Sequence, residues 1–454
     1  MSSSKDRRKD ISGFGRVDYS FDDKYLATVT LRRDGSSVFG GNNKYAYFPG
    51  VSVGWKIDKE DFMAGAADKV DILKLRLGYG QSGNSGIDPY QSLSKYDMTT
   101  NGILGQNKVS GATLTNYMEN PDLKWETTSQ VNLGIDYGFF SRLSGNLDFF
   151  VKNTKDMLVQ VSQSPMTGHK YQWQNAASMR VWGLEYSLNS TNIQTRDFEW
   201  DTQLSFSWTD NEITDYNVTD ESTVAALNTI GVIKGERTNS YYTYVIDGID
   251  PSSGSYRFKD LDGDGSITVK DKAILGTPDP RVILGFGNTF KYKNFALDIF
   301  FNANFGNKMY NYSAMNFTLP NTFETSNYMV DAMNYWSESN PNSDIAANRA
   351  NGNGNALYNS RWIEDAWFIR LQNVTLSYNL ASIPSLRKIF PTAKIYVQAQ
   401  NLFLITPYSG LDPELANNAY MSSSENLPAF LPGSVDMNAY PPARTFTVGL
   451  NFSF

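Results

Sequence analysis

The sequence predicts an all-β protein, a transmembrane antiparallel β-barrel, and three observations carry this prediction. About thirteen stretches place apolar residues at every second position, with polar or small residues between them. Short turns and very long loops alternate between these stretches. The last stretch reaches the final residue through Phe446, Val448, Leu450, Phe452 and Phe454. A strand that separates lipid from a wet lumen needs such an apolar face and such a polar face.

Each stretch keeps the two-residue period of a β-strand throughout. In chain order the stretches are residues 17–21, 27–31, 51–57, 73–79, 131–139, 143–151, 182–188, 198–208, 282–292, 295–305, 367–378, 395–399 and 446–454. Within 367–378 the phase slips, because Trp367, Ile369 and Leu371 share one parity whereas Val374 and the apolar residues after it share the other. One extra residue would restore a single apolar face, so a β-bulge is predicted around Gln372-Asn373.

The connections between these stretches predict a sidedness. Short turns are expected near 22–24, 140–142, 192–197 and 293–294, with medium connections near 58–69 and 381–393. Long loops are expected over 83–124, 155–178, 211–280, 306–364 and 407–443. Short turns on one side of a membrane and long loops on the other are typical of outer-membrane barrels.

The strand count also predicts that this chain is a fragment. A closed antiparallel barrel needs its first and last strands to run in opposite directions, which an odd count does not provide. At least one strand is therefore expected upstream, and the isolated chain is expected to be unstable because its edge strands would be unpaired in lipid. The polar residues 1–10 contain no apolar segment typical of a signal peptide, and we expect residues 1–12 to be disordered or non-native. Residues 13–454 are expected to form the barrel part.

Composition excludes several classes of protein. No run of about 18 apolar residues is present, so the sequence offers no transmembrane helix. The mean hydropathy of -0.41 does not argue against a barrel, since half of each barrel strand is polar. The chain has no cysteine and a single histidine, His169, which argues against disulfides, zinc chemistry and a His-based triad. A formal net charge of -7 argues against a nucleic-acid partner.

Several segments, in this order, resemble SusC/RagA-type TonB-dependent outer-membrane transporters. The resemblance covers nearly the whole chain, and its specificity lies in the combination of segments. These are Leu-Lys-Leu-Arg-Leu-Gly-Tyr-Gly-Gln-Ser-Gly-Asn (73–84), Asn-Pro-Asp-Leu-Lys-Trp-Glu-Thr (120–127), Phe-Lys-Asp-Leu-Asp-Gly-Asp-Gly-Ser-Ile (258–267), Gly-Thr-Pro-Asp-Pro (276–280), Ile-Arg-Leu-Gln-Asn-Val-Thr-Leu-Ser-Tyr (369–378), Gln-Asn-Leu-Phe (400–403) and Tyr-Ser-Gly-Leu-Asp-Pro-Glu (408–414).

The resemblance implies a fold, a location and partners. Members of this family are expected to have 22 strands around an N-terminal plug, in the bacterial cell outer membrane. They take up oligosaccharides or peptides with energy from TonB, often together with a SusD-like lipoprotein. The chain would correspond to roughly the last thirteen strands, without the plug and the TonB-contacting region. The expected partners of the intact protein are therefore outer-membrane lipid, a SusD-like lipoprotein, TonB and a glycan or peptide substrate.

One loop motif predicts a metal site within the expected loop 211–280. Carboxylates at positions 1, 3 and 5 and a glycine at position 6 match a calcium-binding loop. Position 12 carries aspartate where such loops usually have glutamate, so weak structural calcium binding is expected, at a dissociation constant of roughly 10⁻⁴–10⁻³ M. A metal-free acidic turn is the alternative. The candidate ligands are Asp260, Asp262, Asp264, Ser266, Thr268 and Asp271.

Other side chains have a functional and a structural interpretation. Aromatic residues of the long loops could stack on sugar rings or could pack the loops together; the candidates are Tyr171, Trp173, Trp336 and Trp362. Charges on the polar face could line a solute path or could form salt bridges along the barrel wall; these are Arg32, Lys74, Arg76, Asp136, Asp148 and Asp298. His169 is expected on the surface of a loop.

Three alternatives to an energised transporter stay open at this point. A passive pore or adhesin-like barrel would share the strand pattern but would lack a plug domain upstream. An outer-membrane hydrolase would need a nucleophile and a base that converge on the barrel, and its activity would depend on His169. A soluble carbohydrate-binding β-protein would partition into water without detergent. No enzymatic activity and no catalytic residue are predicted.

Overall fold

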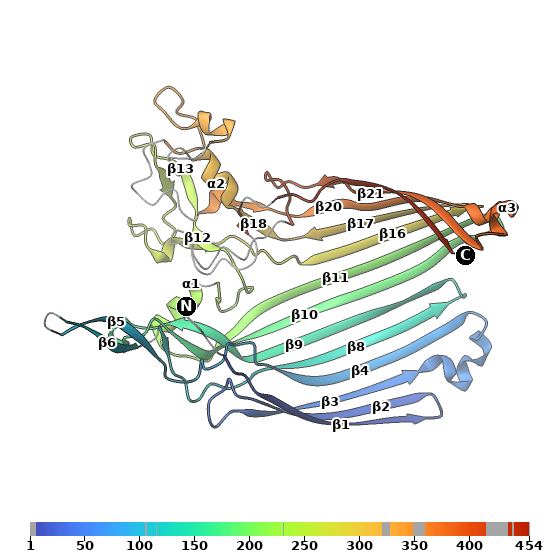
Figure 1. Ribbon diagram of the computed structural model, residues 1–454, viewed down its shortest axis with the longest axis horizontal. Helices are drawn as coiled ribbons and strands as arrows, with labels where there is room; N and C mark the ends of the chain where they lie inside the picture. Colours follow the sequence, from blue (N-terminus) through green and yellow to red (C-terminus); the bar gives the residue numbers. More distant parts are fainter. Residues whose placement is uncertain are drawn as a thin grey trace. The chain divides into compact units, whose positions relative to one another are not determined.

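The computed structural model describes residues 6–104, 107–114, 116–229, 231–319, 327–347, 359–414, 435–437 and 440–453 (Figure 1). The chain divides into two compact units. The first unit comprises residues 1–186, 209–228 and 232–237, and the second comprises residues 187–208, 229–231 and 238–454. Each unit consists mainly of long β-strands and the loops that join them, and each is described by itself below.

The largest sheet contains fourteen strands, thirteen of which follow one path in chain order. The strands of this path that begin in the first unit are β1 (Asp10–Phe21), β2 (Tyr25–Ser36), β3 (Tyr45–Lys56), β4 (Val70–Asn84), β8 (Glu126–Phe139), β9 (Leu143–Ser162) and β10 (Tyr171–Gln194). Those that begin in the second unit are β11 (Phe198–Tyr216), β16 (Val282–Tyr292), β17 (Phe295–Phe305), β20 (Phe368–Asn379), β21 (Thr392–Ile405) and β23 (Thr445–Ser453). Each of the thirteen predicted stretches corresponds to one strand of the path, so the all-β antiparallel prediction is confirmed.

Two of the short turns have the geometry that the right-handed twist of a hairpin favours. Asp22 and Asp23 both have positive φ, at 52° and 50°, and the Lys24 N–H donates to the Phe21 carbonyl oxygen at 3.0 Å. Positive φ at both central positions defines a type I′ turn. Phe140 and Ser141 repeat this geometry between β8 and β9, with φ of 58° and 51°. These hairpins fix the register of the strands that follow them.

The predicted β-bulge is present. Between β17 and β20, Phe300 pairs with Asn373 and the next residue, Phe301, pairs with Leu371, so Gln372 has no partner. The register between β20 and β21 also shifts between Leu371 and Asn373. The extra residue restores one apolar face along β20, which explains the phase slip in the sequence.

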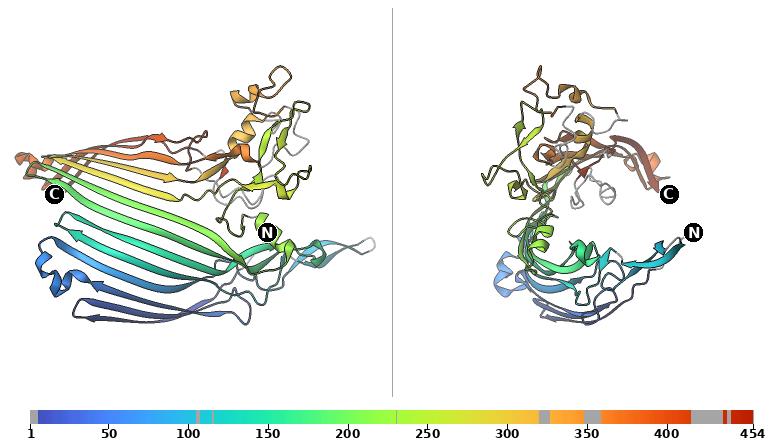
Figure 2. Two further views of the ribbon diagram at one scale, coloured as in Figure 1. Left: turned by 180° about the vertical axis from the view of Figure 1, so that it is seen from behind. Right: turned by 90° about the vertical axis from the view of Figure 1, so that its left-hand side faces the viewer.

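The apolar residues of neighbouring strands align into continuous rows whose members are exposed or half-buried. One row crosses the first unit through Val17, Val29, Val51, Tyr79, Val131 and Val151. A row of the second unit runs through Trp200, Phe290, Leu297, Leu376, Val397 and Val448. Val17 is 69% exposed and Val448 is 74% exposed, which is unusual for valines of a regular sheet in water. Figure 2 gives two further views of the strands that carry these rows. This pattern is typical of a lipid-facing surface.

The strand bounds differ from the sequence prediction at several ends. β9 and β10 extend the ladder through most of residues 155–178, which we expected to form a loop. In β9 the polar residues 152–156 interrupt the apolar alternation, which resumes at Met157, Val159 and Val161. The backbone pairing continues through the interruption, because hydrogen bonds between strands do not require an apolar face. β11 likewise ends at Tyr216, inside the expected loop 211–280. β1 begins at Asp10, so three residues of the segment 1–12 are in a strand, and residues 1–5 lie outside the described residues.

The long loops carry small secondary-structure elements of their own. Their strands are β5 (Tyr96–Leu104), β6 (Asn107–Leu114), β7 (Tyr117–Met118), β12 (Tyr242–Tyr244), β13 (Ile246–Ile249), β14 (Tyr256–Phe258), β15 (Lys272–Ile274), β18 (Lys308–Asn311), β19 (Ile363–Asp365) and β22 (Val435–Asp436). The α-helices are α1 (Glu221–Thr229), α2 (Tyr312–Thr318) and, in the medium connection after β20, α3 (Pro384–Arg387). Short 3₁₀ turns complete the connections. No helix in the described part of the chain is long and apolar enough to cross a membrane.

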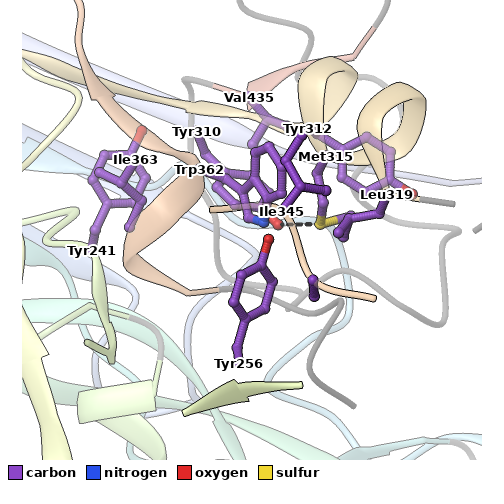
Figure 3. Close-up of a cluster of buried hydrophobic side chains, with 11 residues drawn as sticks. Tyr241, Tyr256, Tyr310, Tyr312, Met315, Leu319, Ile345, Trp362, Ile363 and Val435 are labelled. Atoms are coloured by element: carbon purple, nitrogen blue, oxygen red, sulfur yellow. Dashed lines mark hydrogen bonds between the residues drawn. The ribbon is translucent and has the colours of Figure 1, made fainter. Parts of the chain in front are cut away.

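The buried side chains lie mostly in the loops rather than on the long strands. In the second unit one cluster joins loop segments that are far apart in the sequence (Figure 3): Tyr241, Tyr256, Tyr310, Tyr312, Met315, Leu319, Ile345, Ala346, Trp362, Ile363 and Val435. A smaller cluster in the first unit contains Val38, Phe39, Phe48, Ile87, Leu123 and Trp125. The long loops are therefore packed structures with hydrophobic cores, and these cores position the candidate site.

The two faces of β3 should respond differently to the same charge. Val53 is an exposed member of the apolar face, whereas the adjacent Ser52 lies on the polar face. We expect Val53→Arg to lower the free energy of unfolding by about 2–4 kcal/mol in lipid vesicles, because a charge on the lipid face is costly. Ser52→Arg is the matched control and should be tolerated. Urea titration of the folded, heat-modifiable band of the protein in its natural length measures both variants, and equal losses would contradict the assignment of the faces.

Candidate functional site

The polar face of the first unit forms an open groove of about 500 Å³. Hydroxyl and amide side chains of β2, β3, β4 and β8 line it, together with Arg16 of β1, three glycines, Val51 and Tyr79. The lining residues include Arg16, Thr28, Thr30, Gly50, Ser52, Gly78, Gly80, Gln81, Ser82, Thr128, Gln130 and Asn132. Arg16 forms an ion pair with Asp18 at 2.8 Å, so this groove is close to neutral. Such a surface offers many hydrogen-bonding groups to an uncharged polar solute.

Charged residues predicted on the polar face pair with one another. Arg76 donates to Asp136 at 2.8 Å and to Asp148 at 2.9 Å, and Lys74 lies 3.9 Å from Asp136. Gly134 makes room for this network, because a Cβ there would clash with the Asp148 carboxylate and the Arg76 guanidinium. These charges could line a solute path or form salt bridges along the barrel wall, and the arrangement agrees with the salt bridges.

Two other charged candidates of the polar face also have local partners. Arg32 binds Asp34 at 2.7 Å. Asp298 accepts a hydrogen bond from Thr289 at 2.7 Å. Neither side chain therefore presents an isolated charge to a passing solute.

The predicted calcium loop brings its first three carboxylates together. Oxygens of Asp260, Asp262 and Asp264 all lie within 4.8 Å of one another. The Asp260 carboxylate accepts hydrogen bonds from the Gly263 N–H at 2.7 Å and from the Gly265 N–H at 2.8 Å. Both glycines have positive φ, which a side chain would disfavour. Three converging carboxylates match the oxygen ligands that calcium prefers.

Asp271 differs in burial from the three converging aspartates of the predicted calcium loop. It is fully buried, and its carboxylate accepts hydrogen bonds from the Leu261 N–H at 2.8 Å and the Thr268 N–H at 2.7 Å. These backbone donors lower the pKa of Asp271, because they stabilise its ionised form. The contribution of Asp271 to stability is therefore present above its unfolded pKa and is lost as pH falls through the folded one. Asp271 closes the loop, while Ser266 and Thr268 lie along the same turn.

The predicted stacking aromatics do not form one surface. Tyr171 lies beside Tyr117, with ring centroids 6.0 Å apart, and Trp173 packs against the hydrophobic cluster of the first unit. Trp336 is half-buried in a loop of the second unit. Trp362 is 4% exposed and belongs to the cluster in Figure 3, so it offers no free ring face. Trp362 is therefore a packing residue, which corrects its place among the sugar-stacking candidates. His169 is half-buried in the connection between β9 and β10.

A second groove, of about 600 Å³, lies among the loops of the second unit. It combines exposed apolar side chains with hydroxyl and amide groups. Its lining residues are Asn311, Ser313, Ala314, Phe317, Thr318, Met329, Asp331, Ser409, Gly410, Leu411, Asp436, Tyr440 and Pro441. Tyr440 is 92% exposed and Leu411 is 68% exposed, so the tyrosine ring and the leucine side chain are both accessible to a solute. Aspartates are the charged residues in this lining, which disfavours an anionic solute.

A buried ion pair anchors the loop that contributes to this groove. Arg370, on β20, donates to Asp412 at 2.8 Å and to Glu414 at 2.8 Å. Arg370 is 4% exposed and Asp412 is 3% exposed. Burial raises the pKa of Glu414, and the charge of Asp412 raises it further, against the opposite effect of Arg370. The ionised Glu414 side chain therefore lowers the free energy of unfolding when the pH lies above its pKa in the folded protein.

Sequence reasoning missed both the loop groove and this ion pair. The groove residues come from separate loops, and no periodic pattern links Phe317 with Tyr440. The Arg370–Asp412 pair had a usable signal, because both residues lie in segments that carry the family resemblance, residues 369–378 and 408–414. An arginine within a strand and an aspartate within a Gly-Leu-Asp-Pro turn could have been proposed as partners.

Removing the cation of this pair should destabilise the loop. We expect Arg370→Leu to lower the free energy of unfolding by about 3–5 kcal/mol, because Asp412 would stay buried without its partner. The double variant Arg370→Leu/Asp412→Leu should recover most of this loss. Arg142→Leu, at an exposed turn, is the control for loss of an arginine. Urea titration of the protein in its natural length, in lipid vesicles, measures all three variants, and an unrecovered double variant would contradict the explanation.

Comparisons with a family model, with curated proteins and with solved structures agree with one another. Residues 1–402 match the family model described as TonB dependent receptor-like, beta-barrel. The chain is 34% identical, over 98% of its length, to TonB-dependent receptor P3 of Formosa agariphila. It is 31% identical, also over 98% of its length, to TonB-dependent receptor SusC of Bacteroides thetaiotaomicron. The matches cover 45% and 44% of these relatives, so the chain spans about half the length of the curated relatives it matches.

A solved structure gives the same relationship. The chain aligns with a chain of the RagAB peptide transporter structure at a TM-score of 0.80 and 26% identity. The alignment covers 98% of this chain and 48% of the RagAB chain. Barrels of this kind lie in the bacterial outer membrane and belong to transporters rather than enzymes. The chain belongs to the TonB-dependent receptor-like β-barrel family, of the SusC/RagA type that its sequence predicts.

Proposed function

We propose that this chain forms barrel strands and extracellular loops of a transporter that takes up oligosaccharides or peptides across the outer membrane. Family membership is the observation that carries this proposal. The exposed apolar rows support a lipid-facing wall, and the paired charges support a wet, nearly neutral inner face. The proposed transport involves no covalent reaction, so the protein would bind its solute and release it unchanged.

The two grooves support a neutral or weakly cationic solute. The first groove offers hydroxyl and amide groups, and the second offers Leu411 and Tyr440 beside polar side chains. Sugar rings and peptide side chains both present apolar and hydrogen-bonding faces, so both suit such a lining. RagAB is described as a peptide transporter, which supports peptides as one substrate class.

TonB and a SusD-like lipoprotein are the proposed partners of the full-length protein. The resemblance to SusC and to the RagAB complex supports both partners. The packed loops of the second unit provide a surface with exposed Val330 and Met333, each 81% exposed, where a lipoprotein could contact the transporter. Dependence on TonB distinguishes the proposed transporter from a passive pore, through which solute would pass without TonB.

Uptake should depend on TonB and on the loop groove. Cells that produce the protein in its natural length should accumulate labelled oligosaccharides or peptides, and loss of TonB should abolish this. Leu411→Ala should raise the half-saturating concentration by about tenfold, because a buried leucine contact contributes roughly 1.5–3 kcal/mol. Ile389→Ala, at an exposed site in the medium connection after β20, is the control. Uptake that persists without TonB would assign a passive pore instead.

We also propose that Asp260, Asp262 and Asp264 bind a structural calcium ion. Their convergence and the closing role of Asp271 support this, and a dissociation constant of roughly 10⁻⁴–10⁻³ M is expected. Equilibrium dialysis with radioactive calcium measures the affinity. Asp262→Asn should weaken binding by about tenfold, which corresponds to loss of one carboxylate ligand. Asp88→Asn, an exposed control outside the loop, should have no effect. Equal binding by both variants would contradict the site.

A further inference from the structure

The apolar face of β2 ends in a charged residue. Val29 and Leu31 are both more than half exposed on this face, and Arg33 follows in the same alternation. The register confirms its side, because Arg33 pairs with Gly13 on β1 and with Tyr47 on β3. Arg33 therefore lies on the surface that carries the lipid-facing rows, and not on the polar face of the neighbouring Arg32.

Two tyrosines hold the Arg33 side chain. Its guanidinium carbon lies 4.4 Å from the centre of the Tyr45 ring and 5.5 Å from the centre of the Tyr47 ring. These contacts orient the guanidinium but leave its N–H groups free to donate. Among the residues that the structure describes, no carboxylate forms an ion pair with Arg33. This distinguishes Arg33 from Arg16, Arg32 and Arg76, which are all paired with aspartates.

Arg33 pairs across the strands with Gly13, which has no side chain to cover it. Among the residues that the structure describes, a Cβ atom added at Gly13 would meet no atom within 4 Å, and the same holds at Gly15. The two glycines thus leave a shallow space beside the guanidinium, next to exposed Ile11 and Leu31. A group that enters this space would meet the arginine on one side and apolar side chains on the others. The surroundings suit an amphipathic ligand with an anionic head.

The depth of Arg33 matches the edge of the membrane. It follows Tyr25, at the short-turn end of β2, by about eight residues, which at roughly 3.4 Å per residue is about 27 Å along the strand. A strand tilt of about 40° reduces this to about 21 Å along the membrane normal, close to the height of about 25 Å of an apolar band. Because short turns face the periplasm, Arg33 lies at the outer-leaflet boundary. Tyrosines are enriched at this level.

We propose that Arg33, Tyr45, Tyr47 and Gly13 form a binding site for the phosphate of an anionic lipid headgroup in the outer leaflet. The guanidinium fork would bind two phosphate oxygens, and the acyl chains would cover Leu31 and Val29. The inference rests on the proposed outer-membrane placement and goes beyond transport.

Lipid retention tests the site. The protein in its natural length is reconstituted in phosphatidylethanolamine nanodiscs that contain phosphorylated lipid A, and bound lipid A is measured by native mass spectrometry. Arg33→Gln should weaken binding by about tenfold or more, because a charge-assisted contact to phosphate is lost. Gly13→Leu should give a similar loss without a change of charge, since it fills the open space. Arg142→Gln, an exposed arginine at a short turn, should retain wild-type binding.

Two further measurements separate the possible explanations. Lipid A without phosphate should bind the wild type at the level of Arg33→Gln, and free inorganic phosphate should not displace the phosphorylated lipid. Equal retention of both lipids, or unchanged binding by Arg33→Gln and Gly13→Leu, would overturn the proposal. Displacement by inorganic phosphate would overturn the lipid assignment and leave a simple anion site. Flotation of the protein with vesicles checks the membrane placement independently, and solute uptake by Arg33→Gln should stay normal.

Discussion

The structure depends on the need of each long strand to satisfy its backbone hydrogen bonds while presenting apolar side chains outward. In lipid no water can compensate an unpaired N–H or carbonyl group, so the strands must pair with neighbours over their whole membrane-spanning length. The two-residue alternation then assigns every side chain to one of two faces. The row from Val17 to Val151 and the row from Trp200 to Val448 are direct consequences, because each follows cross-strand partners through the sheet.

The inner, polar face follows a different rule from the outer one. Several charged side chains there form ion pairs, such as Arg76 with Asp136 and Asp148. On the apolar face Arg33 lacks such a partner among the described residues, and only tyrosine rings hold it. This difference is the reason to look outside the chain for its anion. The same logic explains why Asp271 belongs to the closure of its loop, where backbone N–H groups satisfy it.

Strands and their faces were predictable because each depends on local alternation. All thirteen stretches, the bulge at Gln372 and the turns near Asp22 and Ser141 could be read from the chain. The extended ends of β9 and β10 were assigned to a loop, because the polar residues 152–156 interrupt the apolar pattern, although Met157, Val159 and Val161 resume it within β9. The calcium motif predicted which three aspartates converge, because its spacing is local.

The sequence by itself determined the fold class, the side of each strand that faces lipid and the family, because period-two patterns and short motifs carry this information directly. Only the tertiary structure decided which residues from distant loops meet. It placed Trp362 inside a core instead of on a surface, joined Arg370 to Asp412, and assembled the groove around Leu411 and Tyr440. These contacts depend on how long connections pack in space, and no local spacing along the chain encodes that packing.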